Sequence, residues 1–332
     1  MRRRNFITLL GGAAVAWPLA ARAQQPERMR SIGVLMGYAE SDREGQTFLA
    51  AFREELSKTF GWAEDRNIRI DTRWAAPNDT ELRLQFAKEL VALHPDLVVS
   101  HGTPSTVALL QQTRTLPIIF VNVSDPIGSG FVTSFAKPGG NATGFVTMEP
   151  TMAGKWVELL KEIAPRVTRS ALLFNPTTAP YAEYFLDPFK AAAASFAVEA
   201  TAARVRDPAE LEPTIAAQAR EPNGGLIVMP DTFLSTHRAK ITALAAQYRL
   251  PAIYPFRFYA ANGGLLSYGG DNVDIFRRAT VYADRILRGA KPTELPVQAP
   301  VKFELVINHK TATSLGLTIP SSLFVAATEV IE

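Results

Sequence analysis

The sequence predicts an α/β protein of two doubly wound lobes, each with a parallel sheet covered by helices on both faces. Strand-like and helix-like segments alternate about five times in each half of the chain, the pattern of parallel sheets. The length of 332 residues suits two cores of about 120–150 residues better than one. A third observation is the central stretch 116–146, which is typical of the end of one lobe and the crossing into the next.

This central stretch opens with Pro117–Val121, a short run of β-branched and aromatic residues typical of a strand buried on both faces. Asn122 and then Ser124-Asp125-Pro126 follow, in the position past a parallel strand where open α/β sheets hold ligands. The turn signal Pro138-Gly139-Gly140-Asn141 comes next, and a second series of strands and helices begins after it.

The other elements follow from apolar periodicity, with continuous apolar runs for strands and a spacing of three or four for helices. In the first half the predicted strands are Ser31–Met36, Ile68–Trp74 and Asp96–Ser100, and the predicted helices are Gln46–Phe60, Glu81–Leu93 and Ser105–Arg114. In the second half the predicted strands are Arg169–Phe174, Glu199–Val205, Leu226–Met229, Ala252–Tyr254 and Gly263–Tyr268. The predicted helices there are Ala153–Ile163, Tyr181–Phe196, Pro208–Arg220, Ser235–Tyr248, Val273–Leu287 and Lys310–Leu315. The Pro-rich segment Pro292–Lys302 is predicted to be extended and to cross between the lobes.

Residues 1–23 predict a secretion signal. Arg3-Arg4-Asn5-Phe6-Ile7 is a twin-arginine pattern, an apolar segment runs from Phe6 to Leu19, and Ala21-Arg22-Ala23 is a small-x-small cleavage site. The apolar part is shorter than the roughly 20 residues that span a bilayer, which favours cleavage near Ala23 over a retained anchor. Either the twin-arginine or the general route could read this signal. We expect a mature chain that starts near Gln24 and resides in the periplasm.

Composition excludes several classes of function. The chain has no cysteine, and therefore no disulfide, thiolate metal site or cysteine nucleophile. The net charge is only +3, part of it from the arginines at the start, so a basic surface for nucleic acid is not indicated. Neither metal-ligand spacing, nor a nucleophile elbow, nor a phosphate loop is present. We expect no cofactor, no metal and no enzymatic activity, although distant residues could still assemble a serine triad.

Candidate ligand contacts gather where predicted strands end. Gly102-Thr103-Pro104-Ser105 follows a buried strand, with Thr103 suited to an N-cap and Pro104 to the first helical position. The free N–H groups of this helix would suit a carboxylate or phosphate, and plain capping is the alternative. Asp125 and Asp231 each lie just past a buried strand, one per lobe. Either could hold a ligand ammonium group, or could instead form an Asx-turn or helix cap.

Aromatic residues near strand ends, Phe233 among them, could wall a pocket or could pack beneath loops. His101 is the one histidine expected near the cleft, with a structural role favoured over ligand contact. The predicted ligand-binding set is Tyr38, Ser41, Gly102, Thr103, Pro104, Ser105, Asn122, Ser124, Asp125, Asn175, Asp231, Thr232, Tyr254 and Tyr268.

Three sequence motifs together resemble the periplasmic substrate-binding proteins of ABC transporters: LPIIFVNVSDPIGSGFV…PGGNATGF, HGTPST, and the ending VKFELVINHKTATSLGLTIP. The resemblance covers Ile32 to Glu332 and is greatest to the group with tryptophan- and other aromatic amino-acid-binding members. It implies a type I periplasmic-binding fold with a three-stranded hinge. The implied first lobe is 30–145 plus about 266–299, and the second is 146–265 plus about 300–332. The implied ligand is a small molecule bound by its carboxylate and amino group.

We therefore expect an extracytoplasmic solute-binding protein of an ABC importer, a monomer that delivers an amino acid to a permease and its ATPase. The resemblance leans toward an aromatic amino acid. A ligand-sensing module for a membrane receptor would need the same cleft, and a secreted hydrolase or isomerase could use the same fold. Both stay open as alternatives. A cytoplasmic repressor on this fold is disfavoured, since no helix-turn-helix precedes the first strand.

Overall fold

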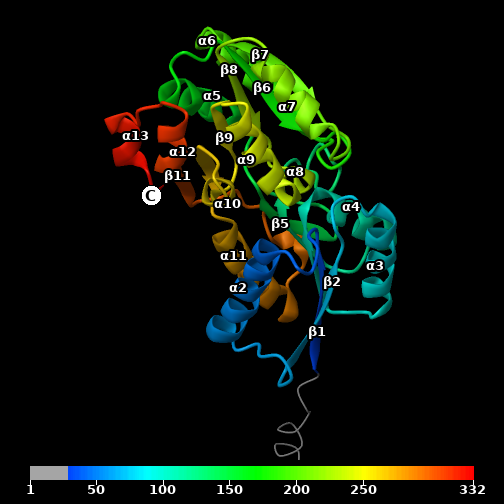
Figure 1. Cartoon of the computed structure of the whole chain (residues 1–332). Coiled ribbons are helices and arrows are strands. Elements are labelled where there is room, and N and C mark those ends of the chain that lie inside the picture. Colours follow the sequence, from blue (N-terminus) through cyan, green and yellow to red (C-terminus); the bar gives the residue numbers. More distant parts are fainter. Residues whose placement is uncertain (1–28) are drawn as a thin grey trace, which may run out of the picture.

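The computed structural model describes residues 29–332, which form two α/β lobes (Figure 1). One sheet has five strands in the order β2-β1-β3-β4-β5, and the other has seven in the order β12-β11-β10-β9-β8-β6-β7. In the part of the chain that the structure describes, no helix is long and apolar enough to cross a membrane. The secretion signal predicted for residues 1–23 lies outside the described residues.

The first lobe is a wholly parallel sheet with helices packed against it. Its strands are β1 (Arg30–Met36), β2 (Ile68–Trp74), β3 (Leu97–His101), β4 (Ile118–Val123) and β5 (Ala142–Val146). Its helices are α2 (Arg43–Phe60), α3 (Thr80–Ala92) and α4 (Gly102–Gln112). Helix α2 begins earlier than predicted because the Asp42 carboxylate accepts hydrogen bonds from the backbone N–H groups of Glu44 and Gly45. It ends at Gly61, whose φ of 77° is left-handed.

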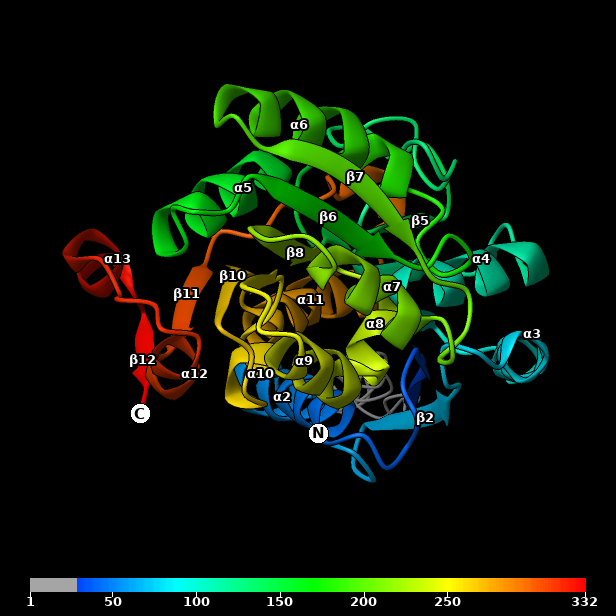
Figure 2. The ribbon, with the colours of Figure 1, turned by 45° about the horizontal axis from the view of Figure 1, so that its top comes forward.

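The second lobe has helices on both faces of its sheet (Figure 2). Its strands are β6 (Arg169–Phe174), β7 (Glu199–Arg204), β8 (Gly224–Val228), β9 (Ala252–Tyr254), β10 (Leu266–Gly270), β11 (Phe303–Asn308) and β12 (Glu329–Ile331). Its helices are α5 (Met152–Ile163), α6 (Ala182–Ser195), α7 (Leu211–Ala219), α8 (Thr232–Thr236), α9 (Arg238–Gln247), α10 (Arg257–Ala261), α12 (His309–Ser314) and α13 (Ser321–Ala326). The prediction of a wholly parallel sheet is wrong for this lobe, because β11 runs antiparallel to β10.

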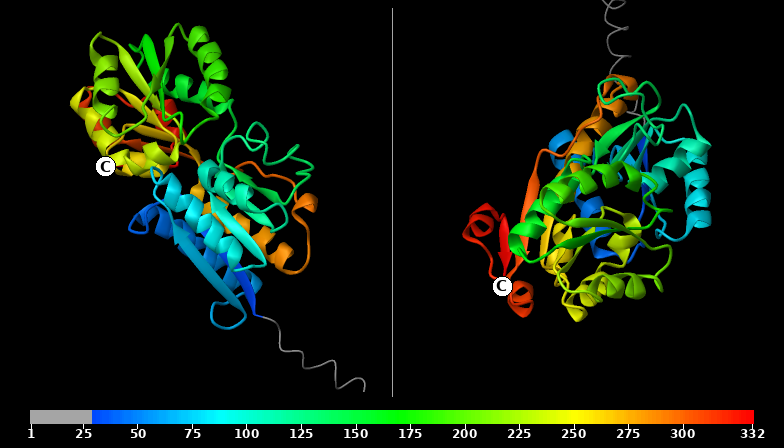
Figure 3. Two further views of the ribbon diagram at one scale, coloured as in Figure 1. Left: turned by 90° about the vertical axis from the view of Figure 1, so that its right-hand side faces the viewer. Right: turned by 90° about the horizontal axis from the view of Figure 1, so that it is seen from above.

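The chain passes between the lobes three times, after β5, after β10 and before β11. Helix α11 (Asn272–Leu287) returns to the first lobe and packs on α2 and β4 (Figure 3), followed by the short 3-10 helix η1 (Pro292–Glu294). Two contacts hold the returning segment on the first lobe. The Thr143 hydroxyl donates to the Leu295 carbonyl at 2.5 Å, and Phe145 and Gln298 form an isolated parallel β-bridge. The predicted return at about residue 266 is early, since Leu266 and Ser267 of β10 pair with β9 in the seven-stranded sheet.

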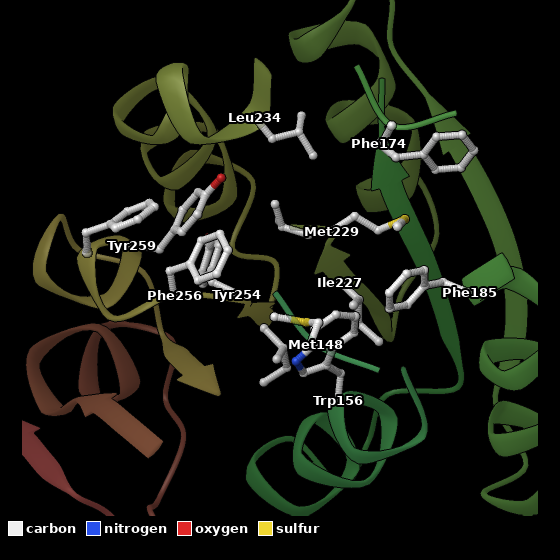
Figure 4. Packing of buried hydrophobic residues seen from close by; sticks show 14 of the residues in the cluster. Met148, Trp156, Phe174, Phe185, Ile227, Met229, Leu234, Tyr254, Phe256 and Tyr259 are labelled. Atoms are coloured by element: carbon white, nitrogen blue, oxygen red, sulfur yellow. The ribbon is translucent and has the colours of Figure 1, made fainter. Parts of the chain in front are cut away.

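The core of the second lobe is rich in aromatic side chains (Figure 4). Trp156 stacks on Phe185 with ring centroids 6.3 Å apart, and its indole N–H donates to the Tyr268 carbonyl at 2.8 Å. Tyr254 stacks on Tyr259 at 4.9 Å. Met148, in the first crossing segment, packs into the same core, so this crossing is anchored by apolar burial.

Candidate functional site

A cleft lies between the two lobes, where strands of both sheets end. It is lined by Tyr38, His101, Gly102, Thr103, Pro104, Asn122, Thr147, Thr178, Tyr181, Pro230, Asp231, Thr232, Ser235, Phe256 and Asn272. About 20 Å³ of free space within it is wide enough for water. The lobes are therefore in a closed arrangement, with the walls of the cleft almost in contact.

Two contacts between the lobes hold this closed arrangement. The Arg238 guanidinium at the start of α9 lies 2.9 Å from the Asp42 carboxylate at the start of α2. Gly102 meets Thr232 so closely that a Cβ atom on Gly102 would lie 3.1 Å from the Thr232 methyl group. Gly102 also has a φ of 80°, so both its conformation and its surroundings favour glycine.

The N-terminus of α4 points its free N–H groups toward the cleft region. The helix begins at Gly102, two residues before Pro104, the predicted first helical position, and the residue in the N-cap position, His101, makes no side-chain capping bond. Thr103 is therefore not the N-cap as predicted but lies in the first turn. A helix N-terminus without a side-chain cap keeps its donors and its partial positive charge available to an anion.

Several buried polar atoms of the cleft lining lack a hydrogen-bond partner within residues 29–332. They are Thr103 Oγ1, Asn122 Oδ1, Thr232 Oγ1, Asn272 Oδ1 and His101 Nδ1. Buried polar groups in proteins are nearly always hydrogen-bonded, because an unmet donor or acceptor costs about 1–3 kcal/mol. Their gathering at one place, from both lobes, is the arrangement expected of groups that bind a polar ligand.

Asp231 is the carboxylate of this cleft and is 2% exposed. Its Oδ1 accepts from the Thr178 hydroxyl at 2.5 Å and from the Phe233 N–H at 2.7 Å, and its Oδ2 accepts from the Asn175 N–H at 2.8 Å. Burial raises the pKa of Asp231 to about 6, against the lowering effect of these hydrogen bonds. Asp231 thus caps α8, as the alternative interpretation predicts, and Oδ2 still has room for a further donor.

His101 has a structural setting. Its ring stacks between Tyr38, 4.9 Å away, and Phe276, 5.8 Å away, and its Nε2 lies 3.3 Å from the Asn122 amide nitrogen. Burial lowers the pKa of His101 to about 4, against a raising effect of Asp42. The imidazole is therefore neutral at ordinary pH and carries no charge to the cleft.

The structure brings together half of the predicted set: Tyr38, Gly102, Thr103, Pro104, Asn122, Asp231 and Thr232 line the cleft. Asp125 does not, because its Oδ1 accepts from the Gly128 N–H at 2.8 Å in an Asx-turn. Tyr254 and Tyr268 pack in the second lobe, and Asn175 braces Asp231. Ser41 lies exposed in the turn before α2, while Ser105 and Ser124 are buried outside the cleft lining.

Six polar or aromatic lining residues are not among the candidates predicted from the sequence: Thr147, Thr178, Tyr181, Ser235, Phe256 and Asn272. Two of them lie just past strand ends: Thr147 directly follows β5, and Asn272 is the second residue after β10. Both therefore share the position past a strand end that marks the other candidates, but the sequence pattern does not reveal the ends of β5 and β10. Thr178 and Tyr181 lie farther along the loop between β6 and α6, and no local sequence pattern marks them.

Comparison with known proteins places this fold and cleft in a family. The model of the family described as "ABC transporter substrate binding protein" matches residues 52–331. The chain belongs to this family of solute-binding proteins. It is 25% identical over 293 residues to a "Tyrosine-binding protein" of Clostridioides difficile, covering 88% of this chain and 82% of the relative.

Solved structures agree with this membership. An ABC domain from Streptococcus pneumonia in complex with L-Trp is 27% identical, with a TM-score of 0.84 over 91% of this chain and 99% of the other. A conserved domain protein from Vibrio cholerae is 29% identical, with a TM-score of 0.82 over 91% of this chain and all of the other. The expected membership in the substrate-binding proteins of ABC transporters, and the expected periplasmic-binding fold, are confirmed.

Proposed function

We propose that this ABC transporter substrate-binding protein takes a free α-amino acid with an aromatic side chain into its interlobe cleft. The observation that carries the proposal is the cluster of unmet buried polar atoms beside the uncapped N-terminus of α4, opposite Asp231. The N-terminus of α4 favours a negatively charged ligand group, and the Asp231 carboxylate favours a positively charged one. A zwitterionic head group complements both ends.

The charges of the lining favour this orientation. Lys and Arg are absent from the lining of the cleft within the described residues, so an anionic group there would rely on N–H groups and hydroxyls. We place the ligand carboxylate at the first turn of α4, with the Thr103 and Thr232 hydroxyls as donors. The ammonium group would then approach Asp231 Oδ2, because a charge removed from water needs a partner. Asp125 is not used, since it lies outside the lining.

The leaning toward an aromatic side chain rests on Tyr38, Tyr181 and Phe256, which supply flat apolar surface in the lining. Relatives named for tyrosine and solved with L-Trp add weight to it. An aromatic amino acid is larger than the free space of about 20 Å³ in this closed arrangement, so the lobes must move apart about the three crossing segments to admit it and to release it.

A thermal-shift comparison tests the ligand class. L-Trp, L-Tyr and L-Phe are expected to stabilise the protein, by about 2.7 kcal/mol at 100 times the dissociation constant. Tryptamine, which lacks the carboxylate, and indole-3-propionate, which lacks the amino group, are the matched controls and should stabilise it far less. Stabilisation by a neutral sugar with no response to amino acids would overturn the proposal. Mass spectrometry of molecules that co-purify with the protein provides an independent check.

The proposed setting is the periplasm, where the protein, as a monomer, would hand its ligand to a permease driven by an ATPase. Support comes from the family and from the signal pattern in residues 1–23. Replacing Arg3 and Arg4 by Lys should leave uncleaved precursor in the cytoplasm if the twin-arginine route is used. Normal export of this variant would assign the protein to the general route, and native protein found in the cytoplasm would contradict the proposed location.

A further inference from the structure

A second cavity, of about 270 Å³, lies beside the cleft. It shares Thr103, Pro104 and Thr178 with the cleft, but most of its wall is formed elsewhere. The first lobe contributes side chains of α3 and α4 together with Pro77, and the second contributes the loop segment 177–180 before α6. Its lining is mostly apolar, with Leu84, Val107 and Pro180 among the contributors.

Arg83 lines this cavity and is an unusual buried cation. Its side chain is 4% exposed, and Nη2 donates to the carbonyls of Ala76 at 2.9 Å and Pro77 at 2.7 Å. Its buried Nε has no hydrogen-bond partner among residues 29–332. No carboxylate of the described chain lies within ion-pair distance of it. Burial lowers the pKa of Arg83, and the charge of the nearby Asp79, which caps α3 through the Leu82 N–H, opposes this lowering without a direct contact. Buried arginines are normally paired with an anion, so the wall of the cavity carries a guanidinium that lacks a directly bound anion.

We propose that this cavity is a second binding site, separate from the amino-acid cleft, for a small aromatic or aliphatic carboxylate. The carboxylate would bind the Arg83 guanidinium, and the apolar part would pack on Leu84, Pro104 and Val107. The size is suitable, because a dry cavity of about 150 Å³ already admits benzene, and 270 Å³ accommodates one substituted ring. The guanidinium with its unpartnered Nε favours an anion over a neutral hydrocarbon.

Because the walls come from both lobes, a molecule in this cavity contacts them together only when the cleft is closed. It therefore binds the closed form better than an open one and shifts the population toward closure. Ligand in the cleft does the same. By linkage the two sites then strengthen each other, each raising the affinity of the other by the same factor. This coupling rests on closure of the lobes, whereas the site itself stands whatever solute occupies the cleft.

A ¹⁹F NMR titration of the mature protein with 4-fluorophenylacetate tests the site, with and without saturating L-Trp. We expect saturable binding that persists in L-Trp and tightens at least about fivefold. Arg83→Gln should weaken the fluorophenylacetate at least about tenfold, because a charge-assisted hydrogen bond is lost. The same variant should leave the neutral analogue 4-fluorophenylacetamide unchanged. Arg53→Gln, which alters a half-exposed ion pair on α2, is the matched control.

Val107→Trp is a second variant, since Val107 is 37% exposed on α4 and can accept a larger side chain that fills the cavity. It should abolish probe binding. Displacement of the probe by L-Trp would show that it occupies the cleft instead, and equal binding by wild type, Arg83→Gln and Val107→Trp would also overturn the proposal. If no amino acid binds the cleft, the titration without L-Trp still decides on the cavity, so the two proposals fail separately.

Discussion

Arg238 and Asp42, 196 residues apart in the chain, form a bidentate contact between the lobes with N···O distances of 2.9 and 3.4 Å. Both side chains are largely buried, and the guanidinium also lies over the Phe258 ring at 5.4 Å. The Asp42 carboxylate bonds simultaneously to the first turn of α2. This pair forms only when the lobes are together, so its energy belongs to the closed state.

Arg238→Gln should therefore weaken ligand binding. We expect about a five- to thirtyfold increase in the dissociation constant, equivalent to about 1–2 kcal/mol, measured by isothermal titration with L-Trp. Lys155→Gln breaks the exposed pair with Glu158 within α5 of the second lobe and should leave affinity unchanged. An unaltered dissociation constant for Arg238→Gln would show that the contact contributes nothing to closure.

Thr103→Val should separate ligand binding from stability. Its hydroxyl is buried without a partner in the described chain, so its removal should not lower the free energy of unfolding. Binding of L-Trp should weaken about tenfold or more, because a hydrogen bond to a carboxylate is lost. Thr106→Val is the contrasting variant, since that hydroxyl bonds to Ser100 and to the Gly102 carbonyl and should be needed for stability. A Thr103→Val protein with native affinity would remove Thr103 from the site.

Ligand affinity should fall as the pH drops below about 6. Burial raises the pKa of Asp231 to about 6, and protonation there removes the charge that faces the ligand ammonium group. The affinity for L-Trp should fall about fivefold between pH 6 and pH 5, approach a tenfold loss per pH unit below that, and stay nearly flat from pH 7 to 8. His101 does not contribute, since its pKa lies at about 4. Binding of indole-3-propionate, which has no amino group, should not weaken in this way, and parallel pH profiles for both ligands would contradict the role of Asp231.

The stability of the ligand-free protein should respond to Asp231 with the opposite sign. Its folded-state pKa of about 6 lies above the ordinary value of 3.8, so the folded state binds the proton more tightly than the unfolded one. The contribution of this group to the free energy of unfolding therefore rises as the pH falls through 6. Urea unfolding at pH 7 and pH 5 should show the native protein gaining stability relative to Asp231→Asn.

Gly269→Ala should destabilise the junction between the lobes. A Cβ atom at Gly269 would lie 1.9 Å from the Pro255 carbonyl oxygen and 3.3 Å from the Met148 Cε, so backbone must move to admit it. We expect a loss of about 1–3 kcal/mol in the free energy of unfolding, measured with urea. Gly140→Ala is the control, because nothing lies within 4 Å of a Cβ atom there. Equal unfolding midpoints for the two variants would show that the backbone at this junction moves to admit a methyl group without loss of stability.

Local patterns located most of the long elements because many of them bury apolar residues at regular spacing, as α5 and α11 do. The predicted strands Ile68–Trp74, Arg169–Phe174 and Ala252–Tyr254 have the bounds found in the structure. The predicted helix Ser235–Tyr248 is two helices, interrupted at His237, because Asp231 starts a separate short turn at α8. Elements such as β12 and α10 are too short for periodicity to reveal.

The site was harder to predict because tertiary contacts decide which strand ends meet. Asp125 and Asp231 occupy equivalent sequence positions, yet one serves an Asx-turn and the other borders the cleft. Tyr254 follows the same rule but packs on Tyr259 instead. The antiparallel course of β11 places β10 inside the second sheet, a pairing that no local pattern encodes.

The return of α11 to the first lobe has a consequence for synthesis. A ribosome that has produced β1 to β5 has made the sheet of the first lobe but not the helix that packs on α2 and β4. That helix and the segment after it, through η1 to Gln298, emerge only after β6 to β10 of the second lobe. The lobe that starts first in the chain is thus completed late, and chains interrupted before Leu287 would expose the apolar surface that α11 covers. Nascent chains released at residue 270 should accordingly be protease-sensitive in the first lobe, whereas those extended to residue 300 should protect it.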